Sequence, residues 1–309
     1  MRQRTLPEFM GKKINDSQIK RLPENAKSQV SVIILTFNEQ LNLSYALASV
    51  KGWSDDIHIV DSGSTDQTLD IVREFDVHIH SNPWKNWAEQ RNWALDNCLL
   101  KHQWVLFLDA DEQLTPAGAV EIAHRTQNAP EHCLSFYLSF DFYFFGRLVQ
   151  NAMYPHLRLV RKEKIRWQSY GAREFCSAPV NSPLIRAKLI HHDHRGIGYW
   201  LKKQIQNAEI EAAELYNKKG HKHDDPKTGT NDNEFPPVKQ KFRHNAREML
   251  NSFCPPLVRP IFFFAHHIIF KTKLFDGRAA VAYALLFGLW YPIMIDVKYL
   301  KLCLTKANK

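Results

Sequence analysis

Acidic and polar side chains gather directly after three predicted strands of this 309-residue chain. The three runs are Thr36-Phe37-Asn38-Glu39, Asp61-Ser62-Gly63-Ser64-Thr65-Asp66 and Asp109-Ala110-Asp111-Glu112. Charged groups are costly to bury, so we expect the runs to lie at the rim of a sheet, where they can converge. Helix capping explains one polar residue in each run, but it does not explain two carboxylates flanking one alanine.

Asp109 and Asp111 alternate along an extended segment, so their side chains are expected to point to the same side. Two carboxylates aimed into one site repel each other unless a cation lies between them. Oxygen ligands suit Mg²⁺ or Mn²⁺, and such ions are usually held jointly by the protein and substrate phosphates. This pair, at the end of the apolar run Trp104–Leu108, therefore predicts a divalent-cation site.

Alternating strands and helices are predicted to position these runs. The pattern gives strands at Val30–Thr36, Ile57–Val60, Val77–His80 and Trp104–Leu108, and helices at Gln40–Val50, Thr68–Phe75 and Asn86–Leu100. Units of this length predict an α/β fold with a mostly parallel sheet and helices on both faces. Ligands of such sheets bind at the carboxyl ends of the strands, which is where the acidic runs lie.

Four segments are predicted along the chain: a flexible basic arm (1–28), a catalytic domain (29–219), a polar linker (220–237) and a basic, apolar helical extension (238–309). Residues 235–309 carry the whole net charge of +9, which favours an anionic partner for this part. A nucleic acid is disfavoured, because the segment is too apolar and contains no groove-reading motif. The ordinary composition excludes wholesale disorder.

The spacing of the cysteine and histidine residues predicts neither a zinc-binding motif nor a disulfide framework. The five cysteines are widely spaced, without a CxxC pair, and a reducing cytosol fits best. A zinc site at His191-His192-Asp193-His194 is disfavoured, because no cysteine or second cluster lies at ligand spacing. No apolar region typical of a signal peptide follows the basic N-terminus before Val30.

Two apolar stretches of the extension, Pro260–Phe270 and Ala279–Ile295, are flanked by basic residues. Three arrangements are compatible with them: helices lying in the headgroup region, a helix packed on the catalytic domain, or a membrane span. Basic flanks around aromatic-rich segments favour the first, on an anionic leaflet.

The acidic runs, together with Arg91-Asn92, make the chain resemble a family 2 glycosyltransferase of the GT-A fold. Within this family it is similar to the branch that includes the lipopolysaccharide-core β-glucosyltransferases. That narrower resemblance continues through Tyr154-Pro155-His156-Leu157-Arg158-Leu159, Glu174, His191 and Phe275-Asp276-Gly277-Arg278. The chain departs from the branch in having Arg173-Glu174 in place of His-Glu, and in its longer polar insert at 220–237.

The resemblance implies a role for each of these residues. The turn with Thr36, Asn38 and Glu39, together with Asp61, would hold the nucleotide base and ribose, and Arg91 would lie near the base. Asp111 would bind the metal directly, Asp109 would contact the ribose or a metal-bound water, and His191 would be a further metal or diphosphate contact. His191 could equally be a core histidine.

Arg91 falls on the apolar stripe of its predicted helix, so it needs a buried partner, and Asp61 is the natural candidate. A purely structural ion pair is the alternative.

The reaction implied by the resemblance is a single displacement with inversion at the anomeric carbon. Glu174, expected in a loop after Gly171, is the candidate catalytic base, with Glu112 as the rival. Arg158 could approach the diphosphate or an anionic acceptor.

The expected function is therefore transfer of a sugar from a nucleotide-sugar donor, UDP-linked by preference, to a lipid-anchored saccharide such as lipopolysaccharide core or a polyprenyl-linked glycan. The enzyme would need Mn²⁺ or Mg²⁺ and would lie on the cytoplasmic face of the membrane. The alternatives are a non-catalytic membrane scaffold with the same fold and, less favoured, a sugar-phosphate nucleotidyltransferase. A dinucleotide dehydrogenase is disfavoured because no GxGxxG follows any strand.

Overall fold

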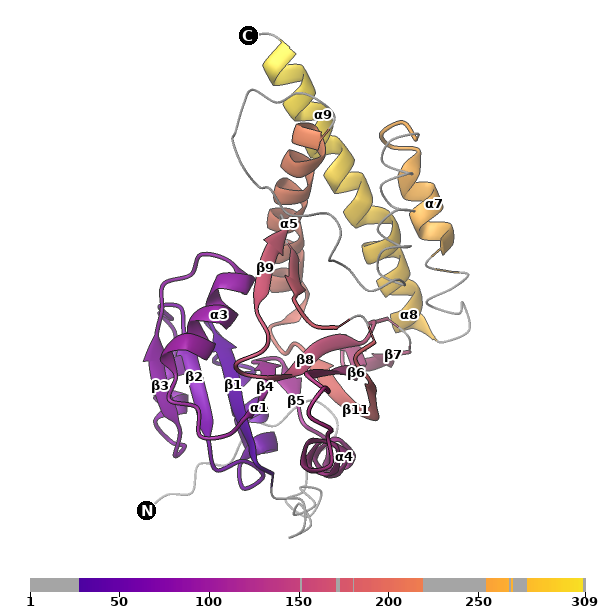
Figure 1. Cartoon of the computed structure of the whole chain (residues 1–309). Helices are drawn as coiled ribbons and strands as arrows, with labels where there is room; N and C mark the ends of the chain where they lie inside the picture. Colours follow the sequence, from indigo (N-terminus) through magenta and orange to yellow (C-terminus); the bar gives the residue numbers. More distant parts are fainter. Residues whose placement is uncertain are drawn as a thin grey trace.

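The computed structural model describes residues 28–150, 152–170, 173–179, 181–218, 254–266, 268 and 277–307. It has a mixed α/β fold with a long helical region rising from one side of a curled sheet (Figure 1). The predicted α/β class and C-terminal helical extension are confirmed. The proposed arm, apart from its last residue, and the proposed linker lie outside the described residues.

The strands in chain order are β1 Val30–Thr36, β2 Ile57–Asp61, β3 His78–Ser81, β4 Trp104–Asp109, β5 Glu112–Gln113, β6 Ser135–Phe144, β7 Arg147–Val149, β8 His156–Arg161, β9 Trp167–Tyr170, β10 Arg173–Cys176 and β11 Leu184–His192. The helices are α1 Leu43–Val50, α2 Thr68–Val72, α3 Trp87–Asn97, α4 Pro116–Gln127, α5 Gly196–Lys218, α7 Arg259–His266, α8 Arg278–Tyr283, η4 Ala284–Trp290 and α9 Tyr291–Ala307.

The first half of the main sheet is parallel, in the order β3-β2-β1-β4. Thr36 pairs with Asp61, and Leu35 pairs with Asp109, so the carboxyl ends of β1, β2 and β4 are level with one another. This register brings the three acidic runs to one edge, as the sequence predicts.

The second half of the sheet is mixed. β8 joins β4 antiparallel, β6 joins β8 antiparallel, and β11 joins β6 in parallel. β5 pairs antiparallel with β11, which places Glu112 opposite His191. Glu174 lies on β10 of the small β9–β10 hairpin, opposite Ser169, and so the expectation of a loop at this residue was wrong. The hairpin holds the side chain in a fixed orientation.

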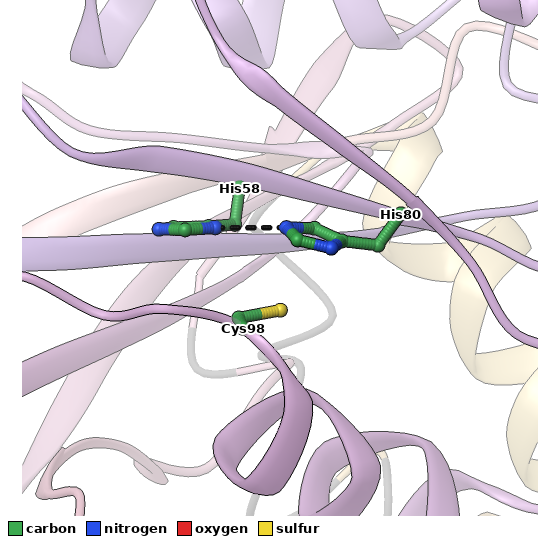
Figure 2. Close-up of side chains that lie close together, drawn as sticks. All are labelled: His58, His80 and Cys98. Atoms are coloured by element: carbon green, nitrogen blue, oxygen red, sulfur yellow. Dashed lines mark hydrogen bonds between the residues drawn. The ribbon is translucent and has the colours of Figure 1, made fainter.

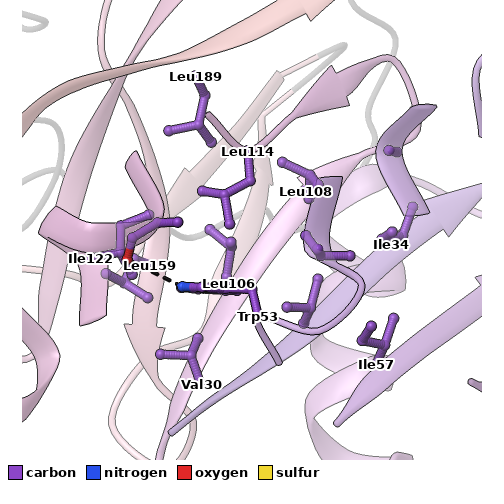
Figure 3. Packing of buried hydrophobic residues seen from close by; sticks show 14 of the residues in the cluster. Val30, Ile34, Trp53, Ile57, Leu106, Leu108, Leu114, Ile122, Leu159 and Leu189 are labelled. Carbon is purple, nitrogen blue, oxygen red and sulfur yellow. Dashed lines mark hydrogen bonds between the residues drawn. The ribbon is translucent and has the colours of Figure 1, made fainter. Parts of the chain in front are cut away.

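Two apolar layers cover the faces of the parallel half. On one face, α1 and α2 pack on alternate residues of β1, β2 and β4, and α4 continues this layer against β11 (Figure 3). Trp53 spans this layer, and its Nε1 donates to the carbonyl of Ala119 at 3.1 Å. On the other face, α3 packs on Ile33, Leu35 and their neighbours. Helix α3 begins where the Asn86 side chain accepts from the Glu89 amide, and its position decides where Arg91 lies.

The C-terminal helices are joined to this body. Tyr283 and Ala280 of α8 pack on Phe144 and Val149 of β6 and β7. Helix α9 packs along α5 through the cluster that includes Tyr216 and Tyr299. From α8 to α9 the chain is helical throughout, and residues Arg278–Thr305 form one helix long and apolar enough to cross a membrane by length and composition. This criterion is also met by core helices of soluble proteins.

Candidate active site

The loops after β1 and β2 are built around Asp61, which is buried. One carboxylate oxygen of Asp61 accepts from Thr36 Oγ1 at 3.0 Å, and the other accepts from the amides of Gly63 and Ser64. Gly63 takes a positive φ of 92°, which suits glycine and lets the loop fold back over the carboxylate. Asp61 therefore fixes the shape of its own loop.

Asn38 links the two loops. Its backbone φ is 55°, in the left-handed region, and its Oδ1 accepts from the amide of Thr65 at 2.8 Å. Its own amide donates to Ser64 Oγ at 2.9 Å. Asn tolerates this conformation better than most residues, because its short side chain can bond locally.

Glu39 pairs with Arg195, a residue that the sequence analysis did not single out. Arg195 NH1 donates to Glu39 Oε1 at 2.6 Å, and Asn42 Nδ2 donates to Oε2 at 2.8 Å. Burial raises the pKa of Glu39 to about 7, although Arg195 acts in the opposite direction. Arg195 is itself held by both oxygens of Asp193 and lies over the Tyr199 ring.

Arg91 is 1% exposed and connects Asp109 with Glu174. Its Nε donates to both oxygens of Glu174 at 2.9 and 3.0 Å, and NH2 donates to Asp109 Oδ1 at 3.0 Å. The expectation that Asp61 is its partner was wrong. Asp61 is occupied by its own loop, whereas α3 directs the guanidinium toward β4 and β10.

Arg158 neutralises the same carboxylates from the opposite side. Its NH2 donates to Asp109 Oδ2 at 2.6 Å, and NH1 lies 3.4 Å from Glu174 Oε1. Although burial acts in the other direction, Arg158 and Arg91 hold the pKa of Asp109 well below its usual range. Asp109 is thus an ionised, doubly paired carboxylate and not a free metal ligand in this arrangement.

Asp111 and His191 face each other across β5 and β11. His191 Nδ1 is buried, has no hydrogen-bond partner within the described residues, and lies 3.8 Å from Asp111 Oδ1 and 3.7 Å from Glu112 Oε1. Glu112 Oε1 is likewise buried and without a hydrogen-bond partner there. Burial by itself lowers the pKa of His191, but the carboxylates of Asp111 and Glu112 raise it to about 9.

These orphaned atoms fit a divalent cation. A carboxylate oxygen and an imidazole nitrogen that approach each other without a hydrogen bond are arranged like two ligands of one ion. Without the ion, a proton on His191 balances the charge of the carboxylates. The groups that suit this role are His191 Nδ1 and the two carboxylate oxygens directed at it, Asp111 Oδ1 and Glu112 Oε1. Of these, His191 Nδ1 and Glu112 Oε1 are the buried atoms without a hydrogen-bond partner in the described part of the chain. Arg195 NH2, 3.7 Å from Asp111 Oδ2, connects the pair to Glu39.

The predicted site residues therefore form two connected groups. Thr36, Asn38 and Asp61 form the first, in which Thr36 donates to Asp61 directly and Ser64 connects Asn38 to Asp61. The second group consists of ion pairs. Arg195 connects Glu39 to Asp111, which lies next to His191. Glu112 connects His191 to Arg158, and Arg158 and Arg91 both contact Asp109 and Glu174. Sequence reasoning missed Asn42, which lies inside the predicted helix Gln40–Val50, and Arg195, which follows the run His191-His192-Asp193-His194. Neither position by itself marks a binding residue.

A family model described as glycosyl transferase family 2 matches residues 31–193, slightly more than half of the chain. The chain belongs to glycosyl transferase family 2. The matched region begins in β1, ends directly after β11, and includes all the predicted site residues of this family 2 chain.

The curated relatives align with part of the family 2 region only. An uncharacterised glycosyltransferase of Rickettsia typhi is 34% identical over 96 residues, which are 31% of this chain and 32% of the relative. The lipopolysaccharide core biosynthesis glycosyltransferase LpsC of Rhizobium meliloti is 33% identical over 96 residues, 29% of this chain and 34% of LpsC. The chain thus spans about a third of the length of the curated relatives it matches.

Solved structures are similar over a longer range but at low identity. TarS residues 1–349 of S. aureus in complex with UDP-GlcNAc is 15% identical, with a TM-score of 0.47 over 87% of this chain and 89% of that chain. Glucosyl-3-phosphoglycerate synthase of Mycobacterium tuberculosis in complex with Mn²⁺, UDP and phosphoglyceric acid has a TM-score of 0.41, with 15% identity over 67% of this chain and 82% of that chain. Similarity at this level is too low to support conclusions about this family 2 chain.

Proposed function

We propose that this chain transfers a sugar from a UDP-linked donor to a hydroxyl group of a lipid-anchored saccharide, with inversion at the anomeric carbon. The observation that carries the proposal is the convergence of Asp109, Asp111 and His191 with two buried arginines at the carboxyl ends of the parallel strands. Membership of glycosyl transferase family 2 supports it.

The chain's own residues divide the work of donor binding. Asp111 and His191 would hold Mn²⁺ or Mg²⁺, which when bound supplies positive charge to the departing diphosphate. The loops built on Thr36, Asn38 and Asp61 would hold the nucleoside. Asp109 would contact the ribose, because Arg91 and Arg158 keep it ionised and fixed in place.

Glu174 is the proposed catalytic base. During transfer the bond between the sugar C1 and the diphosphate oxygen breaks, the acceptor oxygen bonds to C1, and the acceptor proton passes to the base. Glu174 is 21% exposed and can be reached by an acceptor, whereas Glu112 is fully buried and accepts from the Asp109 amide. Glu174 must exchange part of its contact with Arg91 for the acceptor hydroxyl.

The acceptor is proposed to be lipid-anchored because of the C-terminal helices. Ile261 and Phe262 on α7 are 60% and 51% exposed, next to exposed Leu257 and Val258. A buried ion pair between Arg259 and Asp296 holds α7 against α9 and so keeps these side chains directed outward. Exposed apolar side chains in a basic segment suit the headgroup region of an anionic leaflet, on the cytoplasmic face.

The activity is tested by a screen of UDP-sugars with the purified protein, measuring UDP release with and without Mn²⁺. We expect metal-dependent release that falls about a thousandfold in Asp111→Asn, because the charge on the departing diphosphate is no longer balanced. Asp70→Asn, on the exposed face of α2, is the matched control. A non-catalytic scaffold would release no UDP with any donor, and neither variant would differ from the wild type.

Two further variants sharpen the proposal. Glu174→Gln should retain UDP binding but lose transfer, and normal transfer by this variant would show that another group is the base. For the membrane, Phe262→Glu should reduce co-flotation with anionic vesicles, whereas Val120→Glu on α4, also at an exposed apolar position, should not. Equal flotation of both variants would count against attachment through α7.

A further inference from the structure

A second cluster of potential ligands lies away from the acidic rim, where α3 covers the sheet. His58, His80 and Cys98 each direct one ligand atom into a common space, and these atoms all lie within 4.8 Å of one another (Figure 2). His58 Nδ1 and His80 Nε2 are 3.0 Å apart. The function proposed above uses none of these residues.

Three different elements bring these side chains together. His58 is on β2, and His80 is on the neighbouring edge strand β3, where it lies opposite Val60 in the parallel register. His58 and Val60 share a face of β2, so both histidines lie on the face that α3 covers. Cys98 is the residue that ends α3, and it belongs to the apolar cluster packed on this face.

The burial of these groups calls for an explanation. His58 is 1% exposed on a strand face whose other members are apolar, and Cys98 is 6% exposed. A buried imidazole is costly unless both of its ring nitrogens have partners. Here one nitrogen is directed at Asp56 and the other at His80.

Asp56 fixes the orientation of His58. Its Oδ1 lies 2.9 Å from His58 Nε2, while its Oδ2 accepts from Ser31 Oγ and from the amide of Lys101. A carboxylate held in this way accepts a hydrogen bond from Nε2–H, which leaves the lone pair of Nδ1 directed toward His80 and Cys98. A carboxylate behind a histidine is the usual outer partner of a metal-binding imidazole.

We propose that His58 Nδ1, His80 Nε2 and Cys98 Sγ form a binding site for Zn²⁺, with water as the fourth ligand. Two imidazoles and a thiolate suit zinc, whereas the oxygen-rich rim suits Mn²⁺ or Mg²⁺. On binding, Zn²⁺ takes the place of the Cys98 thiol proton, which is released to solvent. Ligands of a tetrahedral zinc lie about 3.5 Å apart, so His58 and His80 need to separate only slightly.

Such an ion would connect the end of α3 to the edge strand β3. Helix α3 also carries Arg91, which pairs with Asp109 and Glu174, and Gln90, which donates to Ser62 Oγ. The proposed ion would therefore stabilise α3, the helix that positions Arg91 and Gln90 at the acidic site, and it would take no part in the transfer reaction.

One rival arrangement uses the other side of His58. Asp56, His58 and His78 also bring ligand atoms within the same distance of one another, and His78 stacks on His58 with ring centres 4.7 Å apart. In that group His58 would bind through Nε2, and Asp56 would be a ligand instead of an outer partner. Cys98 takes no part in it, so a thiolate signature distinguishes the two.

The test uses the full-length protein, freed of metal with a chelator and titrated with Co²⁺ as a spectroscopic probe for zinc. We expect one equivalent of Co²⁺ to give a sulfur-to-cobalt charge-transfer band, which Zn²⁺ then removes. Cys98→Ser should abolish the band, and Cys133→Ser, at a half-buried cysteine outside the cluster, should retain it. Asp56→Asn should weaken binding about tenfold or more, as loss of an outer partner usually does.

A second readout does not depend on absorption. Zn²⁺ should raise the unfolding temperature of the wild type and of Cys133→Ser, but not that of His80→Asn, whose side chain on the edge strand can be changed without disturbing the core. The proposal is overturned if the wild type gives no thiolate band, if Cys98→Ser keeps the band, or if His78→Ala removes binding while Cys98→Ser does not.

Discussion

The middle and the C-terminal end of α3 carry opposite kinds of chemistry. Near its middle, Arg91 enters a network of full charges with Asp109, Glu174 and Arg158. At its C-terminal end, Cys98 meets His58 and His80, which are linked by hydrogen bonds and stacking. The first network is held by charges that compensate one another. In the second, burial favours the neutral forms, because it lowers the pKa of His58 and His80 and raises that of Cys98.

The difference shows how each cluster depends on its members. Removing one charge from the rim leaves its partners buried and unbalanced, which costs more than the pair itself contributes. Removing one member of the His58–His80–Cys98 cluster costs only packing and a hydrogen bond. Loss of a rim charge is therefore expected to lower the stability of the protein as well as its activity, whereas the cluster needs to be complete only to bind an ion.

The largest expected effect is that of Arg91→Met. The substitution keeps most of the side-chain volume but leaves Asp109 and Glu174 with Arg158 alone, so we expect a loss of about 3 kcal/mol in the free energy of unfolding. Urea denaturation measures it. Arg73→Met is the control, because the Arg73–Asp70 pair is largely exposed (65% and 72%) and should contribute less than about 1 kcal/mol. Equal losses in the two variants would contradict the comparison.

A smaller effect is expected from the pH dependence of Glu39. Its pKa is raised from 4.5 to about 7 by burial, so the folded protein holds this proton more tightly than the unfolded chain. The stabilisation is fully present below pH 4.5 and is lost as the pH rises through 7. Between pH 5 and 7, the metal-free wild type should lose about 2 kcal/mol relative to Glu39→Gln. Parallel pH curves for the two proteins would show that Glu39 titrates normally.

The smallest effect is expected from Cys98→Ala in metal-free protein. The substitution removes one sulfur atom from an apolar contact, so the free energy of unfolding should fall by only about 1 kcal/mol. The same urea titration measures it, side by side with Arg91→Met. A loss as large as that of Arg91→Met would mean that the middle and the C-terminal end of α3 are not organised differently.

The order of residue types was enough to predict the parallel half of the fold and the location of the site. Apolar runs at Val30–Thr36, Ile57–Val60 and Trp104–Leu108 are typical of buried strands, and parallel pairing then brings their carboxyl ends, with Asp61 and Asp109, to one edge. These are local patterns with short-range consequences. The family resemblance drawn from the same runs is confirmed by the match over residues 31–193.

Which side chains meet at the site depends on how distant elements pack. Arg91 pairs with Asp109 and Glu174 instead of Asp61, because Asp61 is occupied by the amides of its own loop and the β9–β10 hairpin brings Glu174 to the helix. Arg195 reaches Glu39 across more than 150 residues of chain. His58, His80 and Cys98 have no motif spacing, and they converge because neighbouring strands in register and the end of one helix share a face. Such contacts depend on the packing of distant elements, which no local pattern of residue types encodes.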